Sequence, residues 1–364
     1  MNINKLTHFI ESTAPPSLQE SYDNAGLIVG NPKQEVKGVL ISLDMTEEVI
    51  DEAKNKGANV ILAHHPIIFK GLKQLTGKNY VERVVIKAIK EDIALYAAHT
   101  NLDNIAGGVN GKIADLLDLE QRKILSPLKN RLKKIVTFVP KKYGNRVRNA
   151  LFNAGAGNIG NYDNCSFNTP GEGTFRAGEA THPFVGEKGK LHREQELRIE
   201  SVFPDFKAKE VIKALLNSHP YEEAAYDIYP IDNRYEKAGA GIVGELKEPV
   251  DTLHFLKKIK NIFESGAIRY TKINTPKIKR VALCGGSGSF LLKEAIRAQA
   301  DIYISADFKY HEFFDAEKNI IIADVGHYES EQFTKNLFYE LVTKKFPNFA
   351  CSISEINTNP INYL

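Results

Sequence analysis

Three short and almost wholly apolar runs near the start of the chain limit its fold more than any other feature. They are residues 36–43 (VKGVLISL), 58–63 (ANVILA) and 93–98 (IALYAA). A strand that is buried on both faces has a continuous apolar run rather than an alternating one. Segments with helical spacing, 46–56 and 80–91, separate the runs. Strand, helix, strand, helix, strand with short links predicts a doubly wound parallel sheet.

The last third of the chain repeats this order of elements. The pattern predicts strands at 279–283, 301–305 and 319–325, a glycine-rich turn at 284–289 and a helix at 290–300. GANVILAHHP (57–66) aligns with QADIYISADF (299–308), and ALYAAHTNLD (94–103) aligns with IADVGHYESE (322–331). Strand order and polar positions agree between the two copies. We therefore predict an internal duplication: an α/β protein whose two similar lobes form a central cleft.

The middle of the chain follows a different pattern. Strands and helices alternate there in the order βαββαβ, which is the ferredoxin-like order. We expect three domains: an α/β lobe over 1–130, an inserted ferredoxin-like α+β domain over 131–235, and a second lobe over 236–364. The glycine- and charge-rich stretch 169–193 is expected to be a mobile loop or an interaction surface.

The composition excludes several classes of protein. Of the 364 residues, 43% are hydrophobic and 26% are charged, so the chain is not mainly disordered. A net charge of +3 is too small to make nucleic acid the default partner. No apolar run is long enough for a membrane helix, and the first residues lack the apolar core of a signal peptide. The three cysteines are far apart, so we expect a reduced, cytoplasmic protein with no disulfide framework or thiolate metal site.

Two adjacent histidines follow the second predicted strand. His64 and His65 stand directly after that strand and before Pro66. Ligands of parallel α/β folds gather at the carboxyl ends of strands. Neighbouring histidines on one turn point in different directions, so two metals side by side suit them better than one. The alternative is a pair of loop histidines with ordinary hydrogen bonds.

Three more candidate ligands follow the other strands. Asp103 ends the segment HTNLD, and its carboxylate has enough lone pairs to bridge two metals. The alternative for Asp103 is a turn or a helix cap. His327 and Glu331 are four residues apart, so on a helix both reach the same metal. Taken alone, that spacing is also a common accident.

Together the candidates supply three imidazoles and two carboxylates. With water, these are enough for two metals about 3.5–4 Å apart, the arrangement of metal-assisted hydrolysis. Nitrogen and oxygen ligands suit zinc, manganese, iron or cobalt and do not choose between them. We expect His99, the counterpart of His327, to support a ligand rather than to be one.

Other polar residues near strand ends are open to two interpretations. Asp307, Lys309 and His311 occupy the strand end that matches His64 and His65 in the other lobe. They are candidates for proton transfer or substrate contact, and the alternative is a solvated charged loop. Asp23 and Asp44 are open in the same way. The turn GGSGS (285–289) could hold a phosphate, but a tight turn that needs glycine is favoured.

Six motifs carry a resemblance to a known family. They are SYDNAGL, LAHHP, HTNLD, GGSG, SADFKYHE and GHYESE, and they occur in this order over residues 1–120 and 240–364. In these motifs the chain resembles the dinuclear-metal-centre proteins of the NIF-three type, often called GTP cyclohydrolase I type 2 homologues. The resemblance implies metal ligands at His64, His65, Asp103, His327 and Glu331. It also implies two α/β lobes around a two-metal cleft and a ring-shaped homohexamer.

The middle domain has a resemblance of its own. HPYEEAAYDIYP (219–230) resembles the CutA and PII class of ferredoxin-like folds, so the insert is expected to cap the openings of a ring. For His219 and Tyr221 this favours packing or assembly over chemistry.

The first resemblance implies a metal-dependent hydrolase that opens the guanine ring of GTP and releases formate. A hydrolase of other nucleotides or phosphoesters fits the same residues. A metal-binding regulatory or chaperone-like ring without turnover is the alternative, and a nucleic-acid-binding ring is the least favoured.

Overall fold

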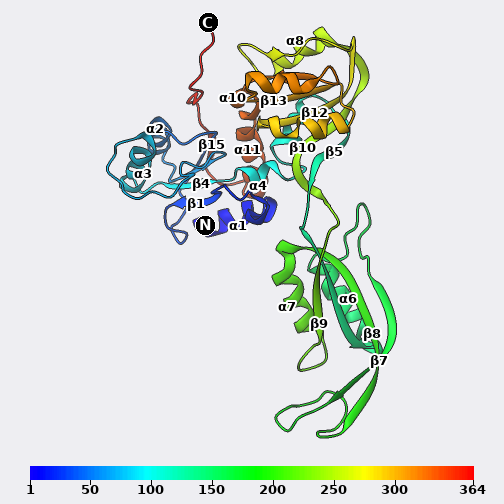
Figure 1. The fold of residues 1–364 in the computed structure, drawn as a ribbon. Coiled ribbons are helices and arrows are strands. Elements are labelled where there is room, and N and C mark those ends of the chain that lie inside the picture. The colour runs from blue at the N-terminus through cyan, green and yellow to red at the C-terminus, as the bar shows by residue number, and fades with distance from the viewer. The chain divides into compact units, whose positions relative to one another are not determined.

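The computed structural model describes residues 1–364 and divides into two compact units (Figure 1). The first combines Met1–Ser126 with Ala238–Leu364, and we call it the two-sheet unit. The second, Pro127–Lys237, is the middle unit. None of the helices combines the length and the apolar character needed to cross a membrane.

One sheet of the two-sheet unit is built mainly from the first hundred residues. Its strands, in spatial order, are β1 (Gly26–Val29), β4 (Ala94–Ala97), β3 (Val60–Ala63), β2 (Val39–Ser42) and β15 (Cys351–Ile353). All neighbours are parallel except β1, which is antiparallel to β4. The three predicted strands are confirmed as β2, β3 and β4. The outer partner β15 comes from the end of the chain, so the two halves of the sequence share this sheet.

The other sheet repeats the same core. Its strands are, in spatial order, β11 (Arg269–Tyr270), β14 (Ile321–Asp324), β13 (Ile302–Ala306), β12 (Lys277–Ser287), β10 (Tyr235–Asp251) and β5 (Glu120–Leu128). β12, β13 and β14 are parallel, and β11 is antiparallel to β14. The order β11-β14-β13-β12 therefore corresponds to β1-β4-β3-β2, which confirms the expected pair of similar α/β lobes.

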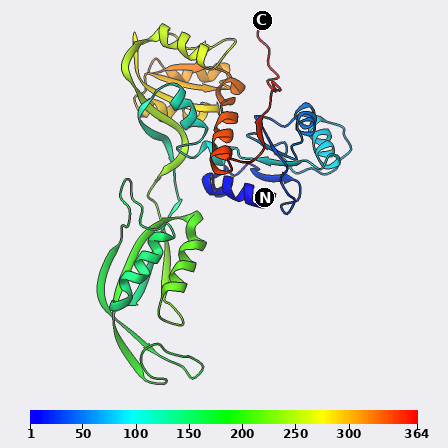
Figure 2. The same ribbon diagram turned by 180° about the vertical axis from the view of Figure 1, so that it is seen from behind.

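Helices cover both sheets (Figures 1 and 2). The helices of the first half are α1 (Ile3–Thr13), α2 (Glu47–Asn55), α3 (Tyr80–Lys90), α4 (Thr100–Asp103) and α5 (Val109–Leu116). Those of the second half are α8 (Thr252–Ile262), α9 (Leu292–Arg297), α10 (His327–Glu331) and α11 (Thr334–Lys345). One hydrophobic core contains residues of both sheets with α1, α5, α8 and α11, so it joins the lobes into one body.

Local sequence signals set the helix ends. Thr46 caps α2, because its side chain accepts a hydrogen bond from the N–H of Val49. Asn79 caps α3 in the same way through the N–H of Glu82. Short 3-10 turns occur at Pro16–Leu18, Lys141–Tyr143, Asp205–Lys207, Ser289–Leu291 and Tyr310–Ala316.

The middle unit has the predicted element order βαββαβ. Its elements are β6 (Leu132–Pro140), α6 (Gly144–Asn153), β7 (Phe167–Arg176), β8 (Leu191–Pro204), α7 (Ala208–Ser218) and β9 (Tyr226–Ile231). The sheet order is β7-β8-β6-β9, with every neighbouring pair antiparallel. Its separate core packs α6 and α7 against β6 and β8.

Two local predictions were wrong. Within the stretch 169–193, expected to be a loop, residues up to Arg176 and from Leu191 onward belong to the long antiparallel pair β7 and β8. The pair is solvated, so its strands carry glycine and charge instead of an apolar pattern. The predicted turn 284–289 begins late, because β12 continues through Gly285 and Gly286 to Ser287.

Candidate metal centre

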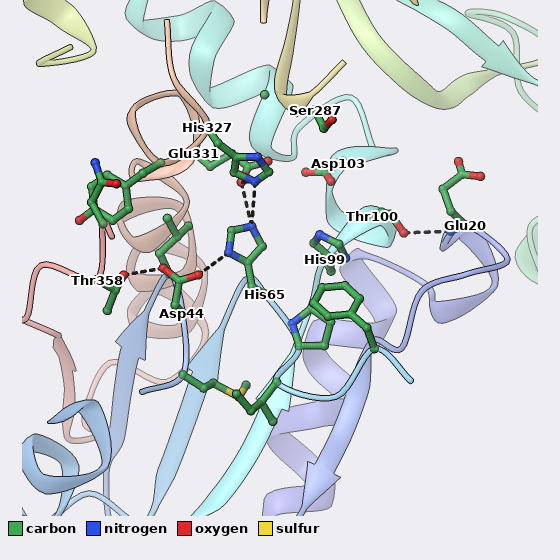
Figure 3. A pocket seen from close by; sticks show the side chains of 18 of the residues that line it. Glu20, Asp44, His65, His99, Thr100, Asp103, Ser287, His327, Glu331 and Thr358 are labelled. Atoms are coloured by element: carbon green, nitrogen blue, oxygen red, sulfur yellow. Dashed lines mark hydrogen bonds and ion pairs between the residues drawn. The ribbon is translucent and has the colours of Figure 1, made fainter. Parts of the chain in front are cut away.

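The carboxyl ends of strands from both sheets bring the five candidate ligands together within the two-sheet unit. His64 and His65 follow β3 directly, and both backbone N–H groups donate to the carbonyl of Leu43. Asp103 ends the short helix α4 after β4. His327 and Glu331 lie on α10 after β14, with the helical placement that the sequence predicted. Figure 3 shows most of this group around His65.

The donor atoms form two groups that share one carboxylate. On one side, His64 Nε2 lies 3.6 Å from Asp103 Oδ1 and 3.7 Å from Glu331 Oε1. On the other side, Glu331 Oε2 lies 2.9 Å from His65 Nε2 and 3.0 Å from His327 Nε2. Each group offers three donors within 4.8 Å of one another. The carboxylate common to both groups is therefore Glu331, whereas the sequence suggested Asp103 as a bridge.

Each imidazole is held at its other nitrogen. His65 Nδ1 lies 2.7 Å from Asp44, and His327 Nδ1 lies 2.7 Å from Asp307. His64 Nδ1 donates to the carbonyl of Ala98 at 2.9 Å. Carboxylates and carbonyls only accept, so Nδ1 carries a proton in all three rings and Nε2 faces the group of donors. This is the usual support of metal-binding histidines.

Burial and charge set the protonation of the cluster. Complete burial lowers the pKa of His64 to about 4, so this ring is neutral and able to act as a ligand. Burial also opposes the charged form of His65, but hydrogen bonds to Asp44 and Glu331 raise its pKa to about 10. Burial and the charge of Glu331 raise the pKa of Asp103 well above its usual value. The charge of His327 outweighs burial and holds the pKa of Glu331 well below its usual range.

The donor set fits bound cations. His64 Nε2 and Asp103 Oδ1 are buried and have no hydrogen-bond partner, which is costly unless a ligand satisfies them. Donors on a tetrahedral zinc ion lie about 3.3 Å apart, close to the His64–Asp103 separation. On the other side, the imidazoles of His65 and His327 and the carboxylate of Glu331 form a second group of three donors. The residues therefore suit one or more divalent ions with mixed nitrogen and oxygen ligands.

A glycine makes room for the shared carboxylate. Gly286 has φ of +61°, and a Cβ at this position would lie 2.2 Å from Glu331 Oε1. Its N–H donates to Ser330 Oγ at 2.9 Å, and Ser330 Oγ donates to the carbonyl of His327. The glycine-rich motif thus allows the end of β12 to pack closely against α10. The N–H groups of Gly285 and Gly286 donate to Asn110 and Ser330, so they do not form the phosphate site that the sequence allowed.

The cluster lies in the wall of a cavity of about 700 Å³. The rest of the wall is largely apolar and aromatic, and it includes residues of both lobes and of the C-terminal segment. These side chains are Tyr22, Met45, Ile67, Phe69, Tyr80, Phe290, Tyr328 and Ile361. The cavity therefore has an apolar wall beside the donor groups.

None of the three predicted proton-transfer residues lines the cavity. Asp307 holds His327 from behind and does not line the cavity. Lys309 and His311 are exposed on the turn after β13, and neither lines the cavity. The N–H of Lys309 donates to Glu312, and the ring of His311 packs against Tyr310. This geometry favours the solvated-loop interpretation for Lys309 and His311.

Other residues have supporting positions that the sequence left open or missed. Asp44 and Asp23 were open candidates, and each holds one histidine: His65 and His99 respectively. Thr358, from the C-terminal segment, donates to Asp44 (Figure 3). No local pattern marks Thr358, because its role depends on a contact across 314 residues of chain.

The fold and the site define a class of protein: two similar α/β lobes with a buried histidine–carboxylate cluster able to hold metal. A family model described as Duf34/NIF3 (NGG1p interacting factor 3) matches residues 1–360. The chain belongs to this family, as its motifs suggested.

Relatives match over their whole length. A protein of Bacillus subtilis (strain 168) named "GTP cyclohydrolase 1 type 2 homolog" is 38% identical over 370 residues, covering 100% of this chain and 99% of its own. A protein of the same name from Halalkalibacterium halodurans is 39% identical over 364 residues, covering 99% of this chain and 98% of its own. The solved structure of a Bacillus cereus protein related to NIF3 has a TM-score of 0.86 and 38% identity, covering 100% and 99%.

Proposed function

We propose that this protein is a metal-dependent hydrolase with a dinuclear centre. In this proposal His64 and Asp103 would hold one divalent ion, His65 and His327 would hold the other, and Glu331 would be shared between them. The observation that carries it is the division of Glu331 between the two donor groups, 3.7 Å from His64 and 2.9 Å from His65. A pair of divalent ions there would supply Lewis acidity and an activated water for hydrolysis.

The cavity supports a small-molecule substrate. About 700 Å³ lies within the range of sites for metabolite-sized ligands. Its aromatic and aliphatic wall suits a planar base or another apolar group. The name shared by the relatives makes GTP the first substrate to test, with hydrolytic opening of the guanine ring and release of formate as the reaction. Other nucleotides and phosphoesters form the second set.

We assign proton handling to His99 in place of Lys309 and His311. His99 lines the cavity, and its ring shares a donor group with His64 and His65 within 4.8 Å. Its Nδ1 donates to Asp23 at 2.8 Å. Burial opposes the charge of Asp23, but its bond to His99 outweighs burial and lowers the pKa of Asp23 to about 2. An ionised Asp23 keeps the ring oriented and leaves its other nitrogen for the substrate.

Metal content and turnover test the proposal together. Protein purified without chelator should hold close to two divalent ions per chain by mass spectrometry, with a large loss in His64→Ala and Glu331→Ala. The matched controls are His254→Ala and Glu340→Ala, both exposed on helices away from the cluster. Absence of bound ions after addition of zinc, manganese or iron would overturn the site.

Turnover separates the hydrolase from a ring that only binds metal. Formate from GTP, and phosphate from a phosphoester panel, should appear with the loaded protein and vanish in Glu331→Ala. In His99→Ala we expect retained metal and turnover reduced by about 10²–10⁴-fold, the usual contribution of a general acid or base. Full metal content with no turnover on any substrate would favour the regulatory or chaperone-like alternative.

We also propose the homohexameric ring that the family resemblance implies. Exposed aromatic side chains on the second lobe support an association surface: Tyr270 is 47% exposed, Tyr310 72% and Phe314 65%. Light scattering during size-exclusion chromatography should give six times the chain mass. A monomeric mass at micromolar concentration would contradict the ring.

A further inference from the structure

The middle unit has a cavity of its own, of about 510 Å³. β7, the start of β8 and the segment before β9 line it, together with residues that follow β7. It contains none of the metal-centre residues. Its features belong to a single compact unit.

A buried carboxylate lies in the wall of this cavity. Glu196 is only 7% exposed, and its Oε1 accepts a hydrogen bond from the hydroxyl of Tyr221 at 2.7 Å. Burial and the charge of Glu196 raise the pKa of Tyr221, so its hydroxyl stays protonated as the donor. The one hydrogen bond to this carboxylate goes to Oε1, which leaves Oε2 without a donor from the protein in the wall of the cavity. A carboxylate oxygen that faces a cavity without a donor from the protein is free to accept a hydrogen bond from a ligand there.

A glycine makes room for this carboxylate. A Cβ at Gly173 would lie 2.2 Å from Glu196 Oε2 and 2.7 Å from its Cδ. Gly171, two residues earlier on the same strand, has no atom within 4 Å of the corresponding point. The sequence PGEGTF therefore has one glycine that the carboxylate requires and one that it does not.

Aromatic rings surround the carboxylate. Tyr221 lies 5.9 Å from Phe175 and 6.3 Å from Phe184, measured between ring centroids. All three rings line the cavity. Aromatic faces attract cations, and they do so more strongly when water is excluded. An aromatic wall with a carboxylate in it therefore suits an organic cation better than a neutral or anionic molecule.

The other charged residues of the wall also favour a positively charged ligand. Glu172, Glu222 and Glu223 line the cavity, against one cation, Arg176. Arg193 pairs with Glu172 at 2.6 Å, and the N–H of His182 donates to Glu222 at 2.8 Å. The backbone N–H does not cancel the charge of Glu222, so four carboxylates face two arginines and the wall keeps a negative excess. No group of three convergent metal donors occurs here, so a bare divalent ion fits less well than an ammonium group.

We propose that the cavity of the middle unit binds a small organic amine, whose ammonium group donates to Glu196 Oε2 between the rings of Phe175, Phe184 and Tyr221. An ammonium has three N–H donors and no acceptor, which matches an oxygen that lacks a donor. The alkyl part of the ligand packs on the aromatic faces. This site is separate from the metal centre. The amine is a second ligand of the protein and takes no part in the proposed hydrolysis.

Calorimetric titration of the full-length protein, in chelator, tests the site with putrescine and spermidine as probes and 1,4-butanediol as the uncharged comparison. The amines should bind saturably and the diol should not. Glu196→Gln should weaken amine binding by about tenfold or more, the usual loss for a charge-assisted hydrogen bond. Glu210→Gln, an exposed change on α7, should leave binding unchanged.

A second pair of variants keeps the charges unchanged. Gly173→Ala should abolish amine binding by displacing Glu196 Oε2, whereas Gly171→Ala should bind as the wild type does. Amide exchange in β6 and β8 checks that each variant remains folded. Absence of saturable amine binding at millimolar concentration would overturn the proposal. Equal binding by folded Glu196→Gln and wild type, or equal binding of the diol, would also overturn it.

Discussion

At the scale of single residues, Gly286 is the position where backbone conformation and site chemistry coincide. Gly286→Ala puts a side chain at a left-handed φ, which costs about 1–2 kcal/mol, and directs it at Glu331 Oε1. We expect reduced stability and loss of most bound metal, measured by urea unfolding and mass spectrometry. Gly71→Ala, where a Cβ meets no atom within 4 Å, is the control and should retain both. Full metal binding by Gly286→Ala would contradict the inference that Glu331 needs the space that glycine leaves at position 286.

Asp44 tests whether support behind a ligand matters as much as the ligand. Asp44→Asn keeps the shape but removes the charge that holds His65 Nδ1 at 2.7 Å. Metal affinity should fall by about 10–100-fold, the usual effect of losing such a partner. Thr358→Val, which removes the donor to Asp44, should have a smaller effect in the same direction. Competition with a fluorescent chelator measures both, and Asp51→Asn, in an exposed pair with Lys87, should match wild type.

At the scale of elements, the sequence predicts best where burial is continuous. β2, β3 and β4 follow directly from apolar runs, because every residue of these strands is buried. α2 follows from its threonine cap and its one apolar face. Most of β7 was expected to be loop, because a solvated strand needs no apolar residues. The pairing of β15 with β2 depends on a register between residues about 300 apart, such as Cys351 with Val39, which no local period encodes.

The link between α7 and β9 contains a buried histidine, His219, that we expect to make stability depend on pH. His219 is buried, with Nε2 donating to the carbonyl of Phe138 at 2.9 Å and Nδ1 accepting from the N–H of Tyr221 at 3.1 Å. Burial lowers its pKa below 6.5, so the unfolded chain binds the proton more readily than the folded one. The stabilising effect is complete above pH 6.5 and is lost as the pH falls below that value.

Hydrogen exchange of β6 and β9, corrected for intrinsic rates, measures this dependence. Protection should be weaker at pH 5.5 than at pH 7.5 in the wild type. His219→Gln should remove most of the difference, because glutamine does not titrate. Equal protection at both pH values in the wild type would show that His219 is not the controlling group.

At the scale of the whole molecule, the site requires both lobes. His64, His65 and Asp103 come from the first lobe, and His327 and Glu331 come from the second. The rule that ligands gather at strand ends anticipates this grouping from sequence. The sharing of Glu331 could not be anticipated, because it depends on how a core common to both sheets sets one lobe against the other.

Metal should therefore stabilise one unit of the chain and not the other. All donors lie in the two-sheet unit, and the middle unit has its own core. A ligand that binds only the folded state stabilises by about 2.7 kcal/mol at a concentration one hundred times its Kd.

Calorimetry of chelated and metal-loaded protein should show one transition shifting upward by several degrees with metal, while the other stays in place. Hydrogen exchange assigns the shifted transition to β2, β3 and β12. In Glu331→Ala the shift should disappear. Equal shifts of both transitions, or a shift that persists in Glu331→Ala, would mean that the stabilising ions bind outside this cluster.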